Sequence, residues 1–393
     1  MSPSSVAPSL TEENVMAASR EVTAFCAENA AAVDRDDAFP AEEFGRIAAS
    51  GLLTVPLARS RGGLGWGAEP GGMVQLLHVL TLLGEANLAV ARLYEGHVNA
   101  LLLIQQFGAP ERTVAELLDP AVADRLHAVW NTEADHGVRL LPIGDGRYRI
   151  DGAKTFASGA GFVERPLITA ALPDGGWQMV LLDLTLERPV VDQRAWRPIG
   201  MKATASGRID LTGIIVSNDA FVGRPGDYYR QPWFGAGAVR FAAAQLGGAI
   251  ALAEAARADL RASGRTNDEA QRRRLGQICI DLETGTLLLE RAGQLADRSR
   301  FGGMPEPTVD DRTMNGYADL VRTAIERICL NAIEYAQRSV GVRSLIGPHP
   351  IERISRDLSI YLRQPAPDAA LRNVGELAFE HARPIHRAWG RTR

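Results

Sequence analysis

The residues whose types could support chemistry gather in one stretch, residues 130–223. Thr132 and Ser158 carry hydroxyls, which donate and accept hydrogen bonds at the edge of a polar ligand. Phe156 can form an aromatic wall against a flat ring, and Gly137 lets the backbone approach a phosphate closely. Each also has an ordinary interpretation, because hydroxyls satisfy strand ends, a phenylalanine packs in a core and glycines form turns.

Charged side chains elsewhere give further candidates. Arg240 could contact a phosphate or carbonyl oxygen of a substrate, and a structural ion pair explains it equally well. His349 lies in a Pro-His-Pro loop and is interpreted as a turn residue, whereas Arg272-Arg273-Arg274 is typical of a solvated helix face. Asp368 follows a proline-rich break, and its plain interpretation is the N-cap of a helix over 369–382.

Composition limits the partners and the compartment. The 393 residues carry 43 basic and 47 acidic side chains, without a polybasic face, which argues against nucleic acid and anionic membranes as partners. No apolar run reaches the ~18–20 residues that span a bilayer. Cys26, Cys279 and Cys329 are far apart in apolar-flanked contexts, so they form neither a metal site nor a disulfide framework. We therefore expect buried cysteines and a cytoplasmic protein.

The arrangement of elements predicts a mainly α fold with a central β-domain. Helical patterns are expected over residues 12–25, 40–51, 73–84, 88–107, 238–260, 268–298, 311–339, 352–361 and 369–382, with Thr308 and Asp311 as a capping box. Alternating apolar residues and the turn Gly144-Asp145-Gly146 predict mostly antiparallel strands between them. The expected domains are an N-terminal helical domain (1–125), a small β-barrel or sandwich (126–227) and a C-terminal four-helix bundle (228–393).

This order, together with several short motifs, resembles the acyl-CoA dehydrogenase family of flavoproteins over residues 10–385. The motifs are Gly62-Gly63-Leu64-Gly65, Thr132-Glu133 with Gly137, Asp151-Gly152-x-Lys154-x-Phe156-x-Ser158, Gly200-Met201-Lys202, Gln337-x-x-x-Gly341 and Arg356-Asp357. Each motif alone is weak, and their common order and spacing carry the resemblance.

The resemblance implies FAD bound between the β-domain and the bundle. The implied cofactor-binding residues are Thr132, Gly137, Phe156 and Ser158, with Gln337 and Gly341 at the adenosine end of a partner subunit's cofactor. A site shared between subunits implies a homodimer or homotetramer. The resemblance also implies a small-molecule or carrier-bound acyl substrate, and an electron-transfer partner or oxygen.

The catalytic base of the family is missing from its usual position. Dehydrogenation of a thioester needs a carboxylate to remove the α-proton, and the family places a glutamate eight residues past the Arg-Asp aspartate. Counting from Asp357 gives Pro365, which cannot act as a base. Other members carry the glutamate just before the residue equivalent to Arg240, and residues 235–239 contain no acid. Asp368, three residues from the usual position, is the remaining candidate.

Three functions therefore stay open. The one we favour on sequence alone is an acyl-CoA dehydrogenase-like, FAD-dependent oxidoreductase acting on an acyl thioester or a related small molecule, with Asp368 as the base. The second is a flavin-dependent monooxygenase or oxidase on the same fold, which needs no α-proton base and so suits Pro365. The third is a non-catalytic member that has lost the base.

Overall fold

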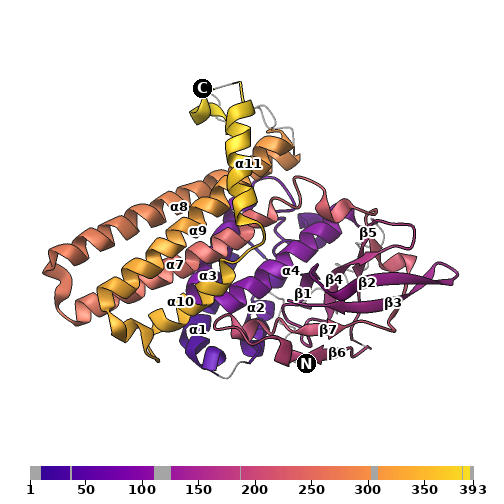
Figure 1. Ribbon diagram of the computed structural model, residues 1–393, viewed down its shortest axis with the longest axis horizontal. Helices are drawn as coiled ribbons and strands as arrows, with labels where there is room; N and C mark the ends of the chain where they lie inside the picture. Colours follow the sequence, from indigo (N-terminus) through magenta and orange to yellow (C-terminus); the bar gives the residue numbers. More distant parts are fainter. Residues whose placement is uncertain are drawn as a thin grey trace, which may run out of the picture.

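Long helices and one β-domain lie side by side in the molecule. The computed structural model describes residues 10–35, 38–109, 125–185, 187–301, 309–382 and 384–389. Figure 1 shows the long bundle helices on the left, the sheet on the right, and α3 and α4 between them. The predicted class, mainly α with a central β-domain, is confirmed. The boundaries at 125/126 and 227/228 stay predictions.

The N-terminal helices bring α4 up to the sheet. They are α1 (Glu12–Arg35), α2 (Ala41–Ala49), α3 (Met73–Ala86) and α4 (Leu88–Phe107). Asn87 separates the last two, because its side-chain oxygen accepts hydrogen bonds from Ala89 N–H (2.9 Å) and Val90 N–H (3.3 Å). This cap fixes the start of α4 and hence the direction of the side chains along it.

The β-domain contains one nine-stranded sheet within the described residues. Its strands are β1 (His127–Trp130), β2 (Glu133–Gly144), β3 (Arg147–Lys154), β4 (Arg165–Ala171), β5 (Trp177–Leu181), β6 (Val190–Asp192), β7 (Arg208–Asp210), β8 (Ile215–Ser217) and β9 (Phe221–Val222). The order is β6-β7-β3-β2-β4-β5-β9, with β1 beside β4 and β8 beside β3. The predicted β2–β3 turn is confirmed, since Asp145 and Gly146 both have positive φ (52° and 67°).

The C-terminal helices form the bundle and one projecting helix. They are α7 (Gly237–Ala262), α8 (Glu269–Phe301), α9 (Asp311–Val340), α10 (Pro350–Tyr361) and α11 (Pro367–Glu380), and α11 rises from the bundle in Figure 1. Asp310 caps α9, because its carboxylate accepts a hydrogen bond from Thr313 N–H at 2.8 Å. Thr308, the predicted capping residue, lies outside the described residues.

A close crossing of α3 and α7 joins the N-terminal helices to the bundle. A Cβ atom on Gly84 would lie 2.1 Å from Ala244 O, and one on Gly247 would lie 2.1 Å from Thr81 O. These glycines let the two backbones approach, and apolar residues of both helical regions form one continuous core. The β-domain has a separate apolar cluster around Trp130.

Two surface properties complete the description. Among the described residues, no helix is both long and apolar enough to cross a membrane. Cys26 and Cys329 are buried as expected, but Cys279 is exposed. The prediction for Cys279 was wrong because it lies on the solvent-facing side of α8, next to the exposed Ile280.

Candidate active site

Ser158 ends a chain of buried hydroxyls at the edge of the β-domain. Its Oγ lies 2.9 Å from Ser206 Oγ, which lies 2.7 Å from Thr204 Oγ1, and Thr204 donates to Met201 O at 2.8 Å. Because each hydroxyl has one proton, Thr204 must accept from Ser206, and Ser206 must accept from Ser158. Ser158 therefore uses its proton inside the protein and can only accept a hydrogen bond from a further partner.

Phe156 lies two residues before Ser158 and is held out in solvent. Its backbone is in the left-handed region (φ 50°), which side chains seldom adopt. The ring is 61% exposed and meets the ring of Trp196 edge-on, with centroids 6.0 Å apart. A large apolar ring exposed at a constrained position suits the predicted role of a wall for a flat ligand.

Thr132 and Gly137 lie in the irregular first part of the β2 region. Thr132 is exposed, and its carbonyl accepts a hydrogen bond from Thr155 N–H at 3.1 Å. Gly137 (φ 77°) is buried, and its carbonyl packs so tightly on Gly152 that a Cβ there would lie 2.0 Å away. Gly137 thus serves the packing of β2 on β3, and the ligand contacts of both residues stay predictions.

Lys154 and Glu133, which belong to the same motifs, form an ion pair beside this loop. Lys154 is fully buried and also donates to Asn131 O and Thr169 Oγ1, each at 3.2 Å. Burial lowers the pKa of Lys154, and Glu133 opposes that shift. Glu133 in turn accepts a hydrogen bond from Val138 N–H at 2.7 Å. The pair therefore fixes the shape of the loop.

Two motifs that are separate in the sequence meet behind the hydroxyl chain. Asp357 accepts a hydrogen bond from Met201 N–H at 2.6 Å, and a Cβ on Gly200 would lie 2.3 Å from the carbonyl of Arg356. Met201 has positive φ (56°). The close approach of Gly200 to α10 places Met201 so that its N–H reaches Asp357 and its carbonyl reaches Thr204.

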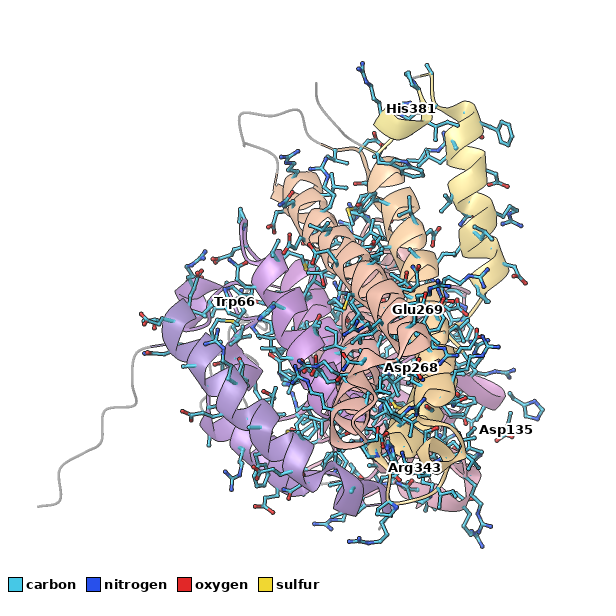
Figure 2. The ribbon with its side chains drawn as sticks, turned by 90° about the vertical axis from the view of Figure 1, so that its left-hand side faces the viewer. Trp66, Asp135, Asp268, Glu269, Arg343 and His381 are labelled. Carbon is cyan, nitrogen blue, oxygen red and sulfur yellow. The ribbon has the colours of Figure 1, made fainter. Side chains whose placement is uncertain are left out.

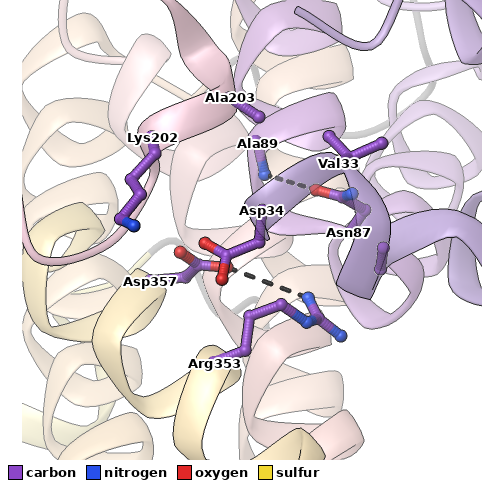
Figure 3. A pocket seen from close by; sticks show the side chains of 9 residues that line it. Val33, Asp34, Asn87, Ala89, Lys202, Ala203, Arg353 and Asp357 are labelled. Atoms are coloured by element: carbon purple, nitrogen blue, oxygen red, sulfur yellow. Dashed lines mark hydrogen bonds and ion pairs between the residues drawn. The ribbon is translucent and has the colours of Figure 1, made fainter. Parts of the chain in front are cut away.

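A cavity of about 10 Å³, near the volume that one water needs, adjoins this contact. Figure 3 shows Asp34, Arg353 and Asp357 converging on it from α1 and α10, with Lys202 on the opposite side. Burial raises the pKa of Asp357 to about 6, while the Met201 N–H and Arg353 oppose that rise.

A second polar group lies between α4, the start of α7 and the end of α10. We call it the Arg240 cluster, and its members are Arg92, Glu95, Asn99, Arg240 and Tyr361. Glu95 accepts hydrogen bonds from the Arg92 guanidinium and the Asn99 amide, and Arg240 Nε donates to Asn99 Oδ1.

The electrostatics of this cluster keep its donors protonated. Burial lowers the pKa of Arg240 to about 10, which still leaves the guanidinium charged at neutral pH. Burial also acts to lower the pKa of Arg92, but Glu95, Tyr361 and Tyr228 together outweigh it, and the pKa of Arg92 is raised. Burial raises the pKa of Tyr361, so its phenol remains a hydroxyl.

Two tyrosines connect this cluster to the β-domain. Tyr229 donates to Asn131 Oδ1 at 3.3 Å, and Asn131 precedes Thr132 in the loop after β1. Tyr228 packs edge-on against Tyr229 with ring centroids 5.0 Å apart. Burial raises the pKa of Tyr228, and the charges of Arg92 and Glu95 act on the same phenol. The Arg240 cluster and the β-domain loop therefore border one region.

Asp368 does not join either group. It is exposed in the first turn of α11, whose N-cap is Ala366, so the predicted capping position was two residues off. The linker before it lies on α9, because Arg322 donates to Pro365 O at 2.9 Å. Among the contacts of the described residues, none links Asp368 to Ser158 or to Arg240, and its assignment as the base stays without support.

Gln337 and Gly341 lie at the other end of the bundle. Gly341 (φ 80°) ends α9, and the neighbouring Ser339 O accepts from Arg265 at 2.9 Å at the turn after α7. Figure 2 looks at that end of the bundle, where it labels Asp268, Glu269 and Arg343. Within one chain, this end of the bundle and the β-domain lie on opposite sides of the molecule (Figure 1).

Comparison with models of protein families identifies the family of this chain. The family models "Acyl-CoA dehydrogenase, N-terminal domain" and "Acyl-CoA dehydrogenase, C-terminal domain" match residues 11–120 and 233–363, which together exceed half of the chain. The chain belongs to the acyl-CoA dehydrogenase family. The resemblance seen in the sequence motifs is thereby confirmed.

Relatives within this fold include enzymes named as monooxygenases. The dibenzothiophene monooxygenase of Mycolicibacterium goodii is 28% identical over 206 residues, 49% of this chain and 48% of that enzyme, so the match spans about half of its length. The structure of FMN-bound TdsC from Paenibacillus sp. A11-2 has a TM-score of 0.83 at 20% identity, covering 96% of this chain and 100% of TdsC. KijD3 in complex with FMN and a dTDP-sugar has a TM-score of 0.82 at 19% identity, with 98% of each chain covered.

These structures correct the predicted cofactor. TdsC and KijD3 are bound to FMN, whereas the sequence motifs led us to expect FAD. FMN has no adenosine, so these structures give no support to the role predicted for Gln337 and Gly341, which stays a prediction. The motifs could not reveal this, because the residues around Ser158 would face the flavin ring, which both cofactors share.

Sequence reasoning missed four members of the Arg240 cluster, Tyr361 and three residues of α4. Arg92, Glu95 and Asn99 recur at helical spacing on one face of α4, which is otherwise apolar over most of its length. Polar residues on the buried face of an apolar helix were the signal that could have revealed them. Asp357 was recognised as part of a motif, but its contact with Met201 depends on the tertiary fold.

Proposed function

We propose that this chain is a flavin-dependent monooxygenase that acts on a small molecule with reduced FMN and oxygen. The observation that carries the proposal is Pro365 at the position where dehydrogenation would need a carboxylate. Glu95 supports the same choice, because both of its carboxylate oxygens are engaged by Arg92 and Asn99. The relatives named as monooxygenases also support it.

The residues at the edge of the β-domain fit a reduced flavin. When bound, a reduced flavin supplies the electrons that activate oxygen. Ser158 can only accept a hydrogen bond, and a reduced flavin ring carries more N–H donors than an oxidised one. Phe156 offers an exposed aromatic wall, and Trp130 holds the Ser158 carbonyl through its indole N–H at 2.9 Å.

Isotope incorporation tests the proposed reaction. The purified chain is supplied with FMN, NADH and a flavin reductase under ¹⁸O₂, with indole and dibenzothiophene as probes, since related enzymes bind or oxidise them. We expect a product that carries one ¹⁸O atom and that requires both the reductase and this chain. Anaerobic bleaching of the flavin by an acyl-CoA would instead establish a dehydrogenase. A chain that binds no flavin would be the non-catalytic member.

Ser158→Ala tests the acceptor role of the hydroxyl chain by binding rather than turnover. Loss of one hydrogen bond worth ~1 kcal/mol should weaken reduced FMN about five-fold while changing oxidised FMN little. The dissociation constants are measured by anaerobic and aerobic fluorescence titration. Ser217→Ala, which removes a hydroxyl of β8, is the matched control. Equal weakening of both redox forms would contradict the polarity argument.

A further inference from the structure

The Arg240 cluster contains buried donors that the protein leaves without partners. Within the described residues, Arg240 Nη1 and the Tyr361 hydroxyl are buried and make no hydrogen bond. Arg240 and Tyr361 are only 4% and 3% exposed, so bulk water does not satisfy them. Buried polar groups are normally paired, and an unpaired group calls for an explanation. Two such donors beside one carboxylate indicate that an acceptor from outside the chain belongs here.

The charge of the cluster identifies the kind of acceptor. Arg92 and Arg240 bring two positive charges to the single carboxylate of Glu95, so the cluster has an excess of one positive charge. Glu95 is already bound to Arg92 and to Asn99. A neutral ligand would leave the excess charge uncompensated, whereas an anion would balance it.

The surroundings show how a ligand could reach the cluster and what its body would contact. The Arg92 side chain is 28% exposed and Asn99 is half-buried, so these two residues mark the side from which a ligand would approach. Tyr228, Tyr229 and Phe234 pack on one another with ring centroids 5.0–5.6 Å apart. Tyr229 and Phe234 remain 43% and 46% exposed, although they are large rings. An aromatic ligand body would cover them.

We propose that the Arg240 cluster binds the carboxylate of a small aromatic acid, with one carboxylate oxygen on Arg240 Nη1 and the other on the Tyr361 hydroxyl. This inference rests on the proposed function in that the acid is the oxygenation substrate. It narrows the substrate class to aromatic carboxylates. Neutral aromatic compounds, indole and dibenzothiophene among them, would leave the excess positive charge unbalanced and should therefore bind more weakly than an acid of the same size.

Calorimetric titration of the full chain, with and without FMN, tests the proposal. The probes are 2-naphthoate and its neutral counterpart 2-naphthamide. Because a charge-assisted hydrogen bond contributes about twice as much as a neutral one, we expect naphthoate to bind about ten-fold more tightly. Arg240→Gln should remove that preference, and Arg343→Gln, at the far end of the bundle, should keep it.

Tyr361→Phe is a second test, which remains informative if Arg240→Gln does not fold. It removes a hydroxyl that has no partner in the chain, so the melting temperature should not fall, whereas naphthoate affinity should drop about three- to five-fold. Equal binding of the two probes, absence of naphthoate binding, or an unchanged preference in Arg240→Gln would each overturn the proposal. These outcomes do not depend on ¹⁸O incorporation. The proposal of an aromatic carboxylate substrate can therefore be refuted while the monooxygenase reaction is observed. Equally, naphthoate can bind as proposed while no ¹⁸O is incorporated.

Discussion

Asp357 connects α10 to the hydroxyl that faces the proposed flavin position. Its carboxylate accepts from Met201 N–H, the Met201 carbonyl accepts from Thr204, and Ser206 continues the chain to Ser158. Burial raises the pKa of Asp357 to about 6, so this carboxyl changes charge close to neutral pH. The charge of Asp357 therefore acts, through Met201 and the chain of hydroxyls, on the hydrogen bond that holds Ser158.

Asp357→Asn should change how stability depends on pH. The pKa of Asp357 is raised from 3.8 to about 6 on folding, so the native state holds this proton more tightly and the resulting stabilisation is lost as pH rises through 6. Relative to the variant, the wild-type free energy of unfolding should fall by at most about 3 kcal/mol between pH 4 and pH 7, at 1.36 kcal/mol per pKa unit. Urea denaturation across that range measures it. The variant keeps the hydrogen bond, because the asparagine side-chain oxygen can still accept from Met201 N–H. Parallel pH profiles of the free energy of unfolding for the two proteins would contradict a raised pKa of Asp357.

Individual residues could be predicted from sequence where local motifs set their position. Ser158 and Phe156 are two residues apart and follow the end of β3, so both lie at the same edge of the β-domain. The Arg240 cluster could not be assembled from sequence, because Arg240 meets Asn99 only where α7 packs against α4. Asp368 was chosen by its sequence distance from Pro365, and the start of α11 leaves it in solvent.

At the scale of elements, the contact between α3 and α7 determines where α4 and Arg240 lie. Gly84 and Gly247 each face the backbone of the other helix, where a Cβ atom would lie within 2.1 Å of a carbonyl oxygen. Since α4 follows α3 directly and Arg240 is at the end of the first turn of α7, the separation of these helices sets the geometry of the Arg240 cluster.

Gly247→Ala should therefore destabilise the protein. The added methyl group requires α3 and α7 to move apart, and overpacking of this kind costs ~1–3 kcal/mol. Gly276→Ala is the matched control, since Gly276 is also inside a helix but has open space around it. That control should be neutral or stabilising by ~0.5–1 kcal/mol because alanine favours helix. Thermal unfolding of both variants measures the difference, and equal melting temperatures would disprove tight packing at Gly247.

The elements themselves differ in how well sequence predicts them. Residues 88–107 were predicted as a helix and form α4 with the same bounds, because an asparagine cap and a terminal glycine mark its ends. The order of the sheet could not be predicted, since β3 pairs with β7 and β8, which are about 60 residues further along the chain.

At the scale of the whole molecule, the proposed cofactor, FMN, removes one reason to expect an oligomer. A shared adenosine site was the basis for a homodimer or homotetramer, and FMN has no adenosine. The surface of α8 offers independent support. Ile280 and Leu287 are 61% and 55% exposed and lie seven residues apart, on one face of the helix. Aligned exposed apolar residues on a long helix are typical of a contact with another chain.

The double variant Ile280→Asp/Leu287→Asp should therefore dissociate a homo-oligomer of this chain. Burying two carboxylates in an apolar interface is unfavourable, so sedimentation equilibrium should give a lower mass for the variant than for the wild type. Ile215→Asp is the control, because Ile215 is similarly exposed (56%) on β8, away from the bundle, and its substitution should leave the mass unchanged. If the wild-type chain sediments as a monomer, the prediction of a homo-oligomer is wrong. The Arg240 cluster would then have to bind its ligand unaided, which its members, all from one chain, allow.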